Sequence, residues 1–255
     1  MKKTEILFLG TDRCIPGVEN DTASYLIANE ILVDVGWHVT KNLYRNGYRP
    51  NDIDALFFTH MHHDHMMALP AFLYERFTHN DAGKFHIYGP EGLERAVMDA
   101  MRFLQVDLYW PSADHPNVHV LQQGDIVCVG DFRIRTVASN HAVPALSYRF
   151  EDLTSGVSVG VTGDGAYQEK WSDFFAGCDI LIHEYSWGLE KHMPNLAKHS
   201  DICDAAKTAE HAGVGMLCPV HGPYALKDQC EAQILKIYQG PVYWPRPNDR
   251  LTLCK

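Results

Sequence analysis

Apolar positions in the first hundred residues alternate between strand-like and helix-like spacing. Residues 5–10 form an almost continuous apolar run, and residues 23–35 form two apolar arms around Asn29 and Glu30, as in a hairpin. Shorter apolar runs predict strands at 54–58 and 85–88. Apolar residues recur at helical spacing, and so predict helices, in 39–48, 66–77 and 93–104. Strands and helices therefore alternate, which is typical of an α/β protein.

The second half of the chain begins with a different pattern, in which short apolar runs follow one another with Gly-Asp turns between several of them. These runs predict strands at 118–121, 126–129, 132–138, 145–150 and 157–161. Alternation then returns, with strands at 179–183, 216–220 and 251–254 and helices at 201–212 and 225–238. This order predicts two sheets with helices on their outer faces. No linker or low-complexity segment interrupts it, so we expect residues 1–255 to form a single domain.

The most unusual stretch is residues 59–65, which read Thr-His-Met-His-His-Asp-His. Neutral imidazole and carboxylate groups hold zinc-like divalent ions at about 2.0–2.2 Å. Four such groups, His60, His62, Asp64 and His65, exceed what one tetrahedral ion needs once ligands from elsewhere in the chain are added. We therefore expect two ions. The alternative is a polar loop that contains histidines by chance.

The position of this stretch, between a predicted strand and a predicted helix, supports a metal site. His60 and His62 are two positions apart and can point to the same side of the turn. Asp64 and His65 enter the first helical turn and are expected to face a second ion. We expect the remaining histidine, His63, to be a surface residue or a neighbour of the ligands rather than a ligand.

Three further residues of ligand type follow predicted strands: His141, Asp164 and His221. Lone histidines are usually packed or surface residues, but successive strand ends converge at one edge of a sandwich, where distant residues can assemble a site. Asp34 also lies at a strand end. We expect it either to accept a hydrogen bond from a ligand histidine or to be an ordinary turn aspartate.

Composition narrows the classes of function. The chain has 255 residues, of which 46% are hydrophobic, and a formal net charge of −10, which argues against non-specific binding of nucleic acid, although a local basic patch stays open. The first apolar run is too short for a signal peptide, and no run approaches the roughly 20 apolar residues of a membrane span. The seven scattered cysteines contain no C-x-x-C pair. We expect reduced, mostly buried thiols in a cytoplasmic protein that does not bind membranes.

With these residues in hand, the chain resembles the metallo-β-lactamase-fold hydrolases over essentially its whole length. The resemblance implies a four-layer αββα sandwich and two divalent metal ions, zinc first, with manganese or iron as alternatives. It also implies a ligand set: His60, His62 and His141 on one metal, Asp64, His65 and His221 on the other, and Asp164 bridging both.

Within that superfamily the chain is most similar to the ribonuclease Z group and its phosphodiesterase relatives. The stretches that carry this likeness are Leu9-Gly10-Thr11, residues 87–93 (Ile-Tyr-Gly-Pro-Glu-Gly-Leu), Leu181-Ile182-His183-Glu184 and His199-Ser200. In that group a histidine in the place of His199 is thought to help protonate the leaving group. We expect His199 to be catalytic with Glu184 as its partner. The alternative is a structural residue beside Ser200, which could cap the helix beginning at Asp201.

Two departures from ribonuclease Z argue against tRNA as the substrate. The long tRNA-gripping arm of that group is absent, since only residues 151–161 fill its place. The basic residue that commonly follows the last ligand histidine is also absent, because His221 is followed by Gly222-Pro223-Tyr224. We therefore expect nucleic acid to be an improbable partner and a small molecule to be the substrate, with a homodimer as a further expectation.

The expected function is hydrolysis of a small phosphodiester or a related ester by a hydroxide held between the two metal ions. Asp64 would orient or deprotonate the water, and His199 would protonate the departing alkoxide. The first alternative is a lactone, thioester or β-lactam hydrolase of the same fold. A tRNA 3′-processing endonuclease, a redox di-iron protein and a metal-binding scaffold without catalysis rank lower. Di-iron proteins of this fold typically carry a glutamate where His62 stands, and a scaffold would have lost a ligand.

Overall fold

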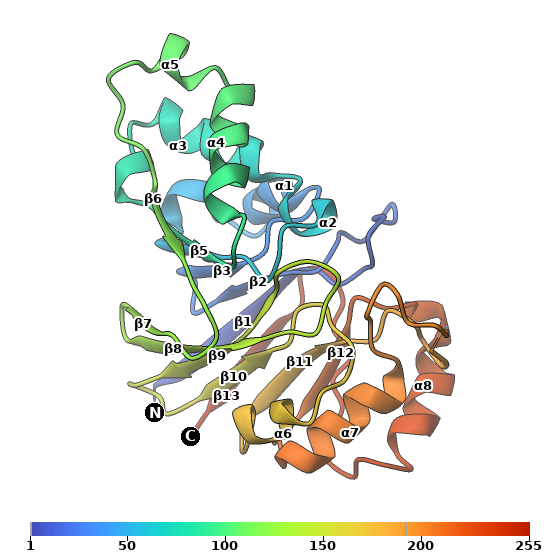
Figure 1. Ribbon diagram of the computed structural model, residues 1–255. Coiled ribbons are helices and arrows are strands. Elements are labelled where there is room, and N and C mark those ends of the chain that lie inside the picture. Colours follow the sequence, from blue (N-terminus) through green and yellow to red (C-terminus); the bar gives the residue numbers. More distant parts are fainter. Residues whose placement is uncertain (1, 192) are drawn as a thin grey trace.

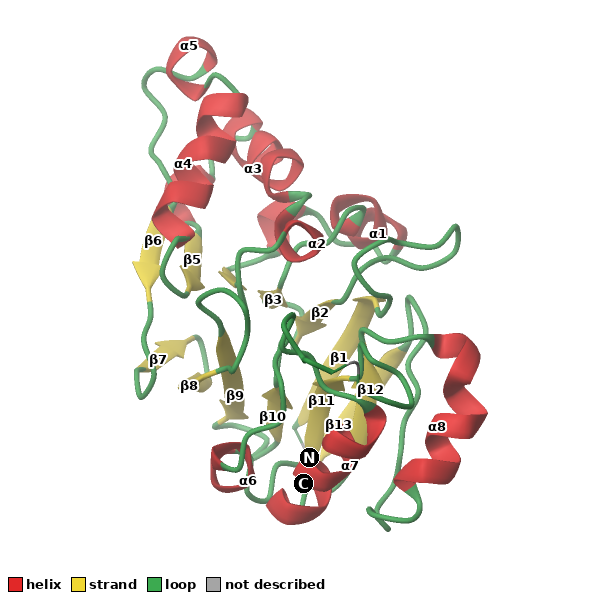
Figure 2. Ribbon diagram, turned by 45° about the vertical axis from the view of Figure 1, so that its right-hand side comes forward, coloured by secondary structure: helices red, strands yellow, loops and turns green. Residues whose placement is uncertain are grey.

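The computed structural model of the protein describes residues 2–191 and 193–255, whose strands form two sheets packed face to face with helices outside them (Figures 1 and 2). The first sheet has the order β13-β1-β2-β3-β4-β5-β6 and the second the order β12-β11-β10-β9-β8-β7. The predicted four-layer αββα arrangement is confirmed.

The strands of the first sheet are β1 (Lys3–Gly10), β2 (Ser24–Ile27), β3 (Ile31–Val33), β4 (Ala55–Phe57), β5 (His86–Gly89), β6 (Asn117–Val120) and β13 (Arg250–Cys254). Those of the second are β7 (Ile126–Val129), β8 (Phe132–Ala138), β9 (Leu146–Asp152), β10 (Ser158–Val161), β11 (Ile180–Glu184) and β12 (Leu217–Val220). Strands β3 to β6 run parallel, as do β10 to β12, so several strands in each sheet end at the same edge.

Each sheet is covered on its outer face by its own set of helices (Figure 1). Over the first sheet lie α1 (Val39–Arg45), α2 (His63–Met66), α3 (Leu69–Thr78) and α4 (Leu93–Phe103), with 3-10 turns at Pro50–Asp52 and Ala82–Lys84. The short helix α5 (Val106–Tyr109) follows α4 and lies farther from the sheet. Over the second lie α6 (Lys170–Phe174), α7 (Ile202–Ala212) and α8 (Lys227–Ile234), the last preceded by a 3-10 turn at Tyr224–Leu226. None of the described helices is long and apolar enough to cross a membrane.

Strand β1 is apolar at every position from Ile6 to Leu9, rather than at alternate positions, because this part of the strand is buried on both faces. Ile6 and Phe8 point into the core between the two sheets, whereas Leu7 and Leu9 point into the core beneath the helices. Side chains of a strand alternate between faces, so a strand buried on both faces must be apolar throughout. The same double burial holds for the short strands β3 and β4, all of whose residues are buried.

The predicted helix 66–77 starts three residues too early. Its observed counterpart, α3, begins at Leu69 with Pro70 in its first turn, and Met66 is instead the last residue of the short helix α2. The predicted hairpin turn at Asn29-Glu30 is confirmed: residues 28–30 form the turn between β2 and β3, with Ala28 and Asn29 at φ values of 51° and 66°.

Three further expectations differ from the structure. Helix α8 stops at Ile234, short of the predicted end at residue 238. The short helices α5 and α6 were not predicted, because a single turn carries too little periodicity to be recognised. The cysteines are all free, but only Cys178, Cys218 and Cys230 are buried, so the expectation of mostly buried thiols is wrong.

The two sheets are joined at the edge where residues 59–65 lie. Leu146 N donates to Thr59 O at 2.9 Å, and His60 forms a bridge with Ala145. Tyr148, on β9, is fully buried and its hydroxyl donates to Phe58 O at 2.6 Å. The second sheet therefore holds the backbone from which the histidine-rich turn departs.

We expect Tyr148→Phe to destabilise the protein by about 1–3 kcal/mol, because it leaves the buried Phe58 carbonyl without its donor while preserving the ring. Urea unfolding would measure the change. Tyr74→Phe is the control, since Tyr74 is exposed and its substitution should leave stability unchanged. Equal stability of the Tyr148→Phe variant and the wild type would show that this hydrogen bond does not hold the sheets together.

Candidate metal centre

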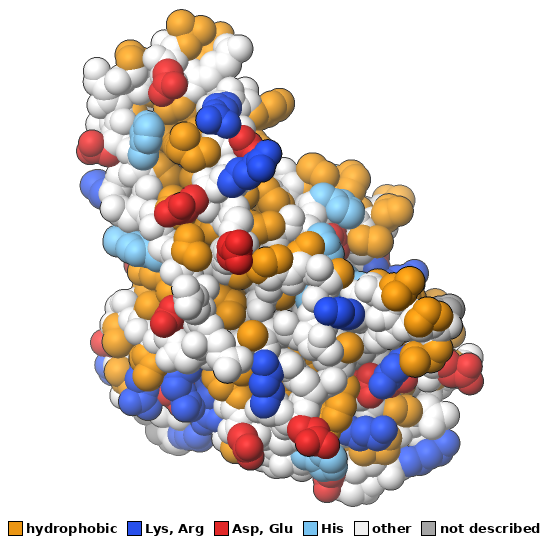
Figure 3. Space-filling view, viewed as in Figure 1, with side chains coloured by type: hydrophobic (Ala, Val, Ile, Leu, Met, Phe, Trp, Pro, Cys, Tyr) orange, Lys and Arg blue, Asp and Glu red, His pale blue; other side chains and the backbone are white. Residues whose placement is uncertain are grey.

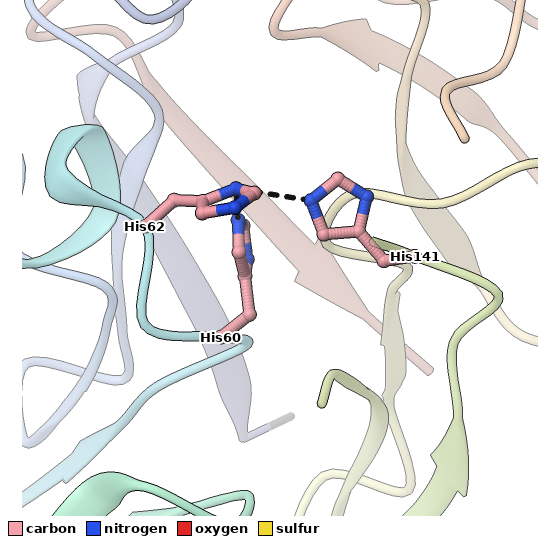
Figure 4. A group of neighbouring side chains, drawn as sticks. All are labelled: His60, His62 and His141. Carbon is pink, nitrogen blue, oxygen red and sulfur yellow. Dashed lines mark hydrogen bonds between the residues drawn. The ribbon is translucent and has the colours of Figure 1, made fainter. Parts of the chain in front are cut away.

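His60, His62 and His141 form a tight group of imidazoles (Figure 4). His60 lies just after β4, His62 immediately precedes α2, and His141 lies in the loop after β8. His62 Nδ1 is 3.0 Å from His60 Nε2 and 3.1 Å from His141 Nε2. Each imidazole nitrogen can make only one good hydrogen bond, so His62 Nδ1 cannot be well hydrogen-bonded to both neighbouring nitrogens at once. Two nitrogens of a tetrahedral zinc site lie about 3.3 Å apart, which fits a cation between the three rings.

The second group consists of Asp64, His65, Asp164 and His221, all buried. His221 Nε2 is 3.0 Å from Asp64 Oδ2, and His65 Nε2 is 3.5 Å from Asp64 Oδ2 and 3.6 Å from Asp164 Oδ2. His65 Nε2 has no hydrogen-bond partner although it is fully buried. A buried polar atom without a partner is costly, and this one faces two carboxylate oxygens. The donor set and its orphaned atom both fit a bound cation.

Asp164 connects the two groups. Its Oδ2 is 3.9 Å from His60 Nε2 and 3.6 Å from His199 Nδ1, in addition to its contact with His65. The preceding Gly163 has a φ of 59°, and a Cβ there would meet Thr59 Cβ at 2.6 Å. Only glycine lets this loop approach the histidine-rich turn so closely, so Gly163 is what brings the Asp164 carboxylate between the groups.

The outer nitrogens of three of these histidines have specific partners. His65 Nδ1 donates to Asp34 Oδ2 at 2.8 Å, and Thr59 donates to the same carboxylate from its N and Oγ1, both at 2.8 Å. His141 Nδ1 donates to Lys198 O at 3.2 Å. Such partners fix the tautomer and leave Nε2 of each ring free to face the centre.

His221 Nδ1 lies 2.8 Å from Ser186 Oγ, which itself donates to His221 O at 3.0 Å. From the sequence, Asp34 is expected to be either a hydrogen-bond partner of a ligand histidine or a turn residue. In the structure it is both, because it adopts a positive φ and accepts from His65. Ser186 and the Lys198 carbonyl were missed. Neither has a sequence signal, because a lone serine and a backbone oxygen occur everywhere.

The pKa values of the histidines shift in opposite directions in the two groups. Burial lowers the pKa values of His60, His62 and His141, and that of His60 falls well below its ordinary value. These three rings are therefore neutral near pH 7, which is the form that ligates metals.

In the second group carboxylates dominate. Burial opposes the charge of His65 and His221, but Asp164 overcomes it and raises the pKa of both rings. Burial likewise opposes ionisation of Asp64 and Asp164, yet the histidines hold the pKa of each carboxyl below its usual range. The pocket therefore concentrates negative charge that attracts cations, protons included.

Glu184, at the end of β11, organises the loops beside this centre. Its Oε1 accepts from Gly165 N at 2.9 Å, His199 Nδ1 at 3.0 Å and Ser200 N at 3.1 Å, and its Oε2 accepts from Ser186 N at 2.8 Å. Burial opposes protonation of His199, but the hydrogen bond and charge of Glu184 raise the pKa of His199 to about 9.

The alternative in which Ser200 caps the following helix is wrong. Asp201 is the N-cap residue of α7, and its side chain accepts from Asp204 N. Ser200 Oγ instead donates to Gly165 O at 2.7 Å. His199 therefore faces the centre for reasons unrelated to helix capping.

Around the centre, the side chain of His63 is 60% exposed, in agreement with its prediction as a surface residue. Met61 and the helices α2 to α4 line an open, mostly apolar groove of about 510 Å³. Over α4 the surface mixes apolar side chains with charged ones of both signs (Figure 3).

The residue after the ligand candidate His221 is Gly222. A Cβ at this position would lie 2.5 Å from the ring of Tyr185, so the backbone here packs directly against that ring.

The chain belongs to the β-lactamase superfamily, because the sequence model described as a beta-lactamase superfamily domain matches residues 29–222. Its architecture is the metallo-β-lactamase fold. Among curated proteins, a ribonuclease Z of Thermococcus onnurineus (strain NA1) is 25% identical to this chain, with 97% of this chain and 94% of that protein covered.

Two solved structures share the fold over nearly the whole length of both chains. The metallo-β-lactamase-fold protein YhfI from Bacillus subtilis superposes with a TM-score of 0.83 at 22% identity, covering 99% of this chain and 100% of that chain. A diphosphatase from the PhnP family superposes with a TM-score of 0.75 at 16% identity, covering 100% and 99%. At these identities the likeness establishes the fold alone.

We expect Asp34→Asn to weaken binding of divalent metal about 10- to 100-fold, because the amide oxygen cannot accept from His65 and both Thr59 donors as the carboxylate does. Competition with a coloured chelator would measure zinc affinity, and circular dichroism would confirm that the variant is folded. Asp54→Asn, at an exposed position, is the matched control. Unchanged affinity in Asp34→Asn would mean that this carboxylate does not orient a ligand.

Proposed function

We propose that the protein is a metal-dependent hydrolase with two divalent ions. His60, His62 and His141 would hold one ion, Asp64, His65 and His221 the other, and Asp164 both. The observation that carries this proposal is the gathering of the seven side chains into two groups linked by Asp164, one of which contains His65 Nε2, buried without a hydrogen-bond partner. Zinc is the first choice, with manganese or iron as alternatives, because nitrogen and oxygen donors suit all three metals.

Two such ions, when bound, lower the pKa of water toward neutrality and polarise the oxygen of the substrate. The side chains of the protein then have separate tasks. The Asp64 carboxylate would orient or deprotonate the attacking water. His199 donates a proton to the departing alkoxide, and since Glu184 engages its Nδ1, Nε2 is the atom that donates.

We further propose that the substrate is a small phosphodiester or a related ester. Strands β9 and β10 are connected only by residues 153–157, so no arm extends from the position at which ribonuclease Z carries one. The net charge of −10 also disfavours a polyanionic substrate. The likeness in fold to a diphosphatase is compatible with small phosphate compounds.

A lactone, thioester or β-lactam hydrolase is the alternative, since the same residues would serve it. Cleavage of tRNA ranks lower for the two reasons above, although the curated relatives named ribonuclease Z keep it as an outcome to test. The single domain, the homodimer and the cytoplasmic location stay predictions.

The metal assignment leads to a prediction on stoichiometry. We expect close to two metal ions per wild-type chain, a loss at both sites in Asp164→Ala, and a loss mainly at one site in His141→Ala, because only Asp164 is proposed to bridge. Elemental analysis after reconstitution with zinc would measure this. Fewer than one ion in the wild type would refute the dinuclear site, and equal losses in the two variants would refute the bridge.

The acid role of His199 is tested by leaving groups. His199→Ala should keep both metals yet lose about 10²–10⁴-fold in turnover of a methyl or nucleoside phosphodiester, whose alkoxide needs a proton. It should lose far less with bis-p-nitrophenyl phosphate, whose leaving group needs none. His79→Ala, at an exposed histidine on the end of α3, is the control.

Equal loss of both substrates by His199→Ala at full metal content would make His199 a binding or structural residue. A wild-type enzyme that prefers lactones or thioesters to every phosphodiester would replace the proposed substrate class with the alternative.

A further inference from the structure

Residues 185–191 and 193–201, as described between β11 and α7, belong to a loop whose neck is closed by Glu184. The carboxylate accepts from Ser186 N near the start of the loop and from Ser200 N near its end. A backbone hydrogen bond from Trp187 N to Ser200 O, at 3.1 Å, closes the neck a second time. His199 therefore lies on a loop whose two ends are fixed to a buried strand.

Within this loop, one amide side chain holds the main chain of His199 on both sides. Asn195 Oδ1 accepts from His199 N at 3.1 Å, and Asn195 Nδ2 donates to His199 O at 2.8 Å. The same Oδ1 accepts from the indole Nε1 of Trp187 at 3.0 Å. Asparagine is suited to this arrangement because it carries an acceptor and a donor on one planar group.

The ring of His199 is confined as well. Trp187 meets it edge to face, with ring centroids 5.8 Å apart and planes at 90°. His141 lies on another side at 5.1 Å, and Glu184 holds Nδ1. Through its hydrogen bond to Asn195, the Trp187 ring that packs against His199 is connected to the side chain that holds the His199 backbone.

The loop also touches the first group of histidines. Lys198, the residue before His199, adopts a φ of 54° and directs its carbonyl to His141 Nδ1. Residues 198 and 199 therefore orient one predicted metal ligand and the predicted acid from adjacent positions. A displacement of the main chain here would disturb the geometry between them.

We propose that Asn195 is a positioning residue for His199, with Trp187 as the second part of the same clamp. This inference rests on the proposed function, in which His199 is the general acid. A proton donor must lie within hydrogen-bond reach of the departing oxygen, and small misplacements of such groups reduce turnover strongly. Asn195 fixes that position through the backbone, while Glu184 fixes the rotation of the ring.

The first experiment measures Asn195→Ala with the two classes of phosphodiester. We expect turnover of the methyl or nucleoside phosphodiester to fall at least 10-fold, with KM, metal content and unfolding midpoint close to wild type. Turnover of bis-p-nitrophenyl phosphate should change less than about twofold. Asn117→Ala is the matched control, since the Asn117 amide also donates to a backbone carbonyl, Gly83 O, but lies on β6. Equal loss of both substrates would overturn the proposal.

A double variant tests whether Asn195 acts through His199. In the His199→Ala background, Asn195→Ala should cause no further loss with the poor leaving group, because the group that it positions is gone. A second full loss there would show that Asn195 acts elsewhere. Trp187→Phe keeps the ring wall but removes the indole donor, and we expect a smaller, leaving-group-selective loss.

Hydrogen exchange followed by NMR gives a readout that needs no turnover. Asn195→Ala should expose the His199 amide and the Trp187 indole N–H to exchange at least 10-fold faster, while the Ser200 amide stays protected by Glu184. Unchanged exchange at the first two protons would overturn the clamp itself. If His199→Ala shows no leaving-group selectivity, the proposed acid role fails, and the exchange rates alone then decide whether Asn195 holds residue 199.

Discussion

The burial of two negative charges at the meeting point of the two sheets is the constraint on which the rest of the structure depends. The Asp64 and Asp164 carboxylates are both buried, and histidines hold their pKa values low. An uncompensated buried charge costs several kcal/mol, so such a pair persists only where positive charge is supplied nearby. Five histidines gather there, three from the turn after β4 and two from distant loops, and the outer nitrogens of His65, His141 and His221 are held by further contacts. The surrounding strands and loops hold these histidines and carboxylates in fixed positions relative to one another.

The two sheets contribute unequal parts to that arrangement. The first provides the turn after β4, which carries most of the ligand-type side chains, and the second provides the loops that bring single residues to meet it. Contacts across the sheets, such as Leu146 N to Thr59 O, determine how far apart these parts lie. The core between the sheets is therefore also what sets the spacing of the site, since packed cores resist small displacements.

Much of this could be predicted from the sequence, and the limits have physical causes. The run from His60 to His65 stands out because so many ligand-type side chains rarely occur together unless they hold a metal, and His141, Asp164 and His221 follow because strand ends share an edge. The partners of these residues could not be predicted in the same way. Ser186, Asn195 and the Lys198 carbonyl act only through the path of an irregular loop, and such loops carry no periodicity. The beginning of α3 was readable from Pro70, but the single turns of α5 and α6 were not.

The contact between Gly222 and Tyr185 bears on how this protein could acquire new substrates. A side chain after His221 would overlap a ring that is itself packed edge to face on Trp244, at 5.6 Å between centroids. A single substitution there forces the buried ring to move, and overpacking of this kind costs about 1–3 kcal/mol. A cationic residue at position 222 therefore requires a compensating change at Tyr185 as well. A variant with a cationic side chain at position 222 and an unchanged Tyr185 is therefore less stable than the wild type. Substitutions in the surrounding loops can introduce a cation near the site without this cost.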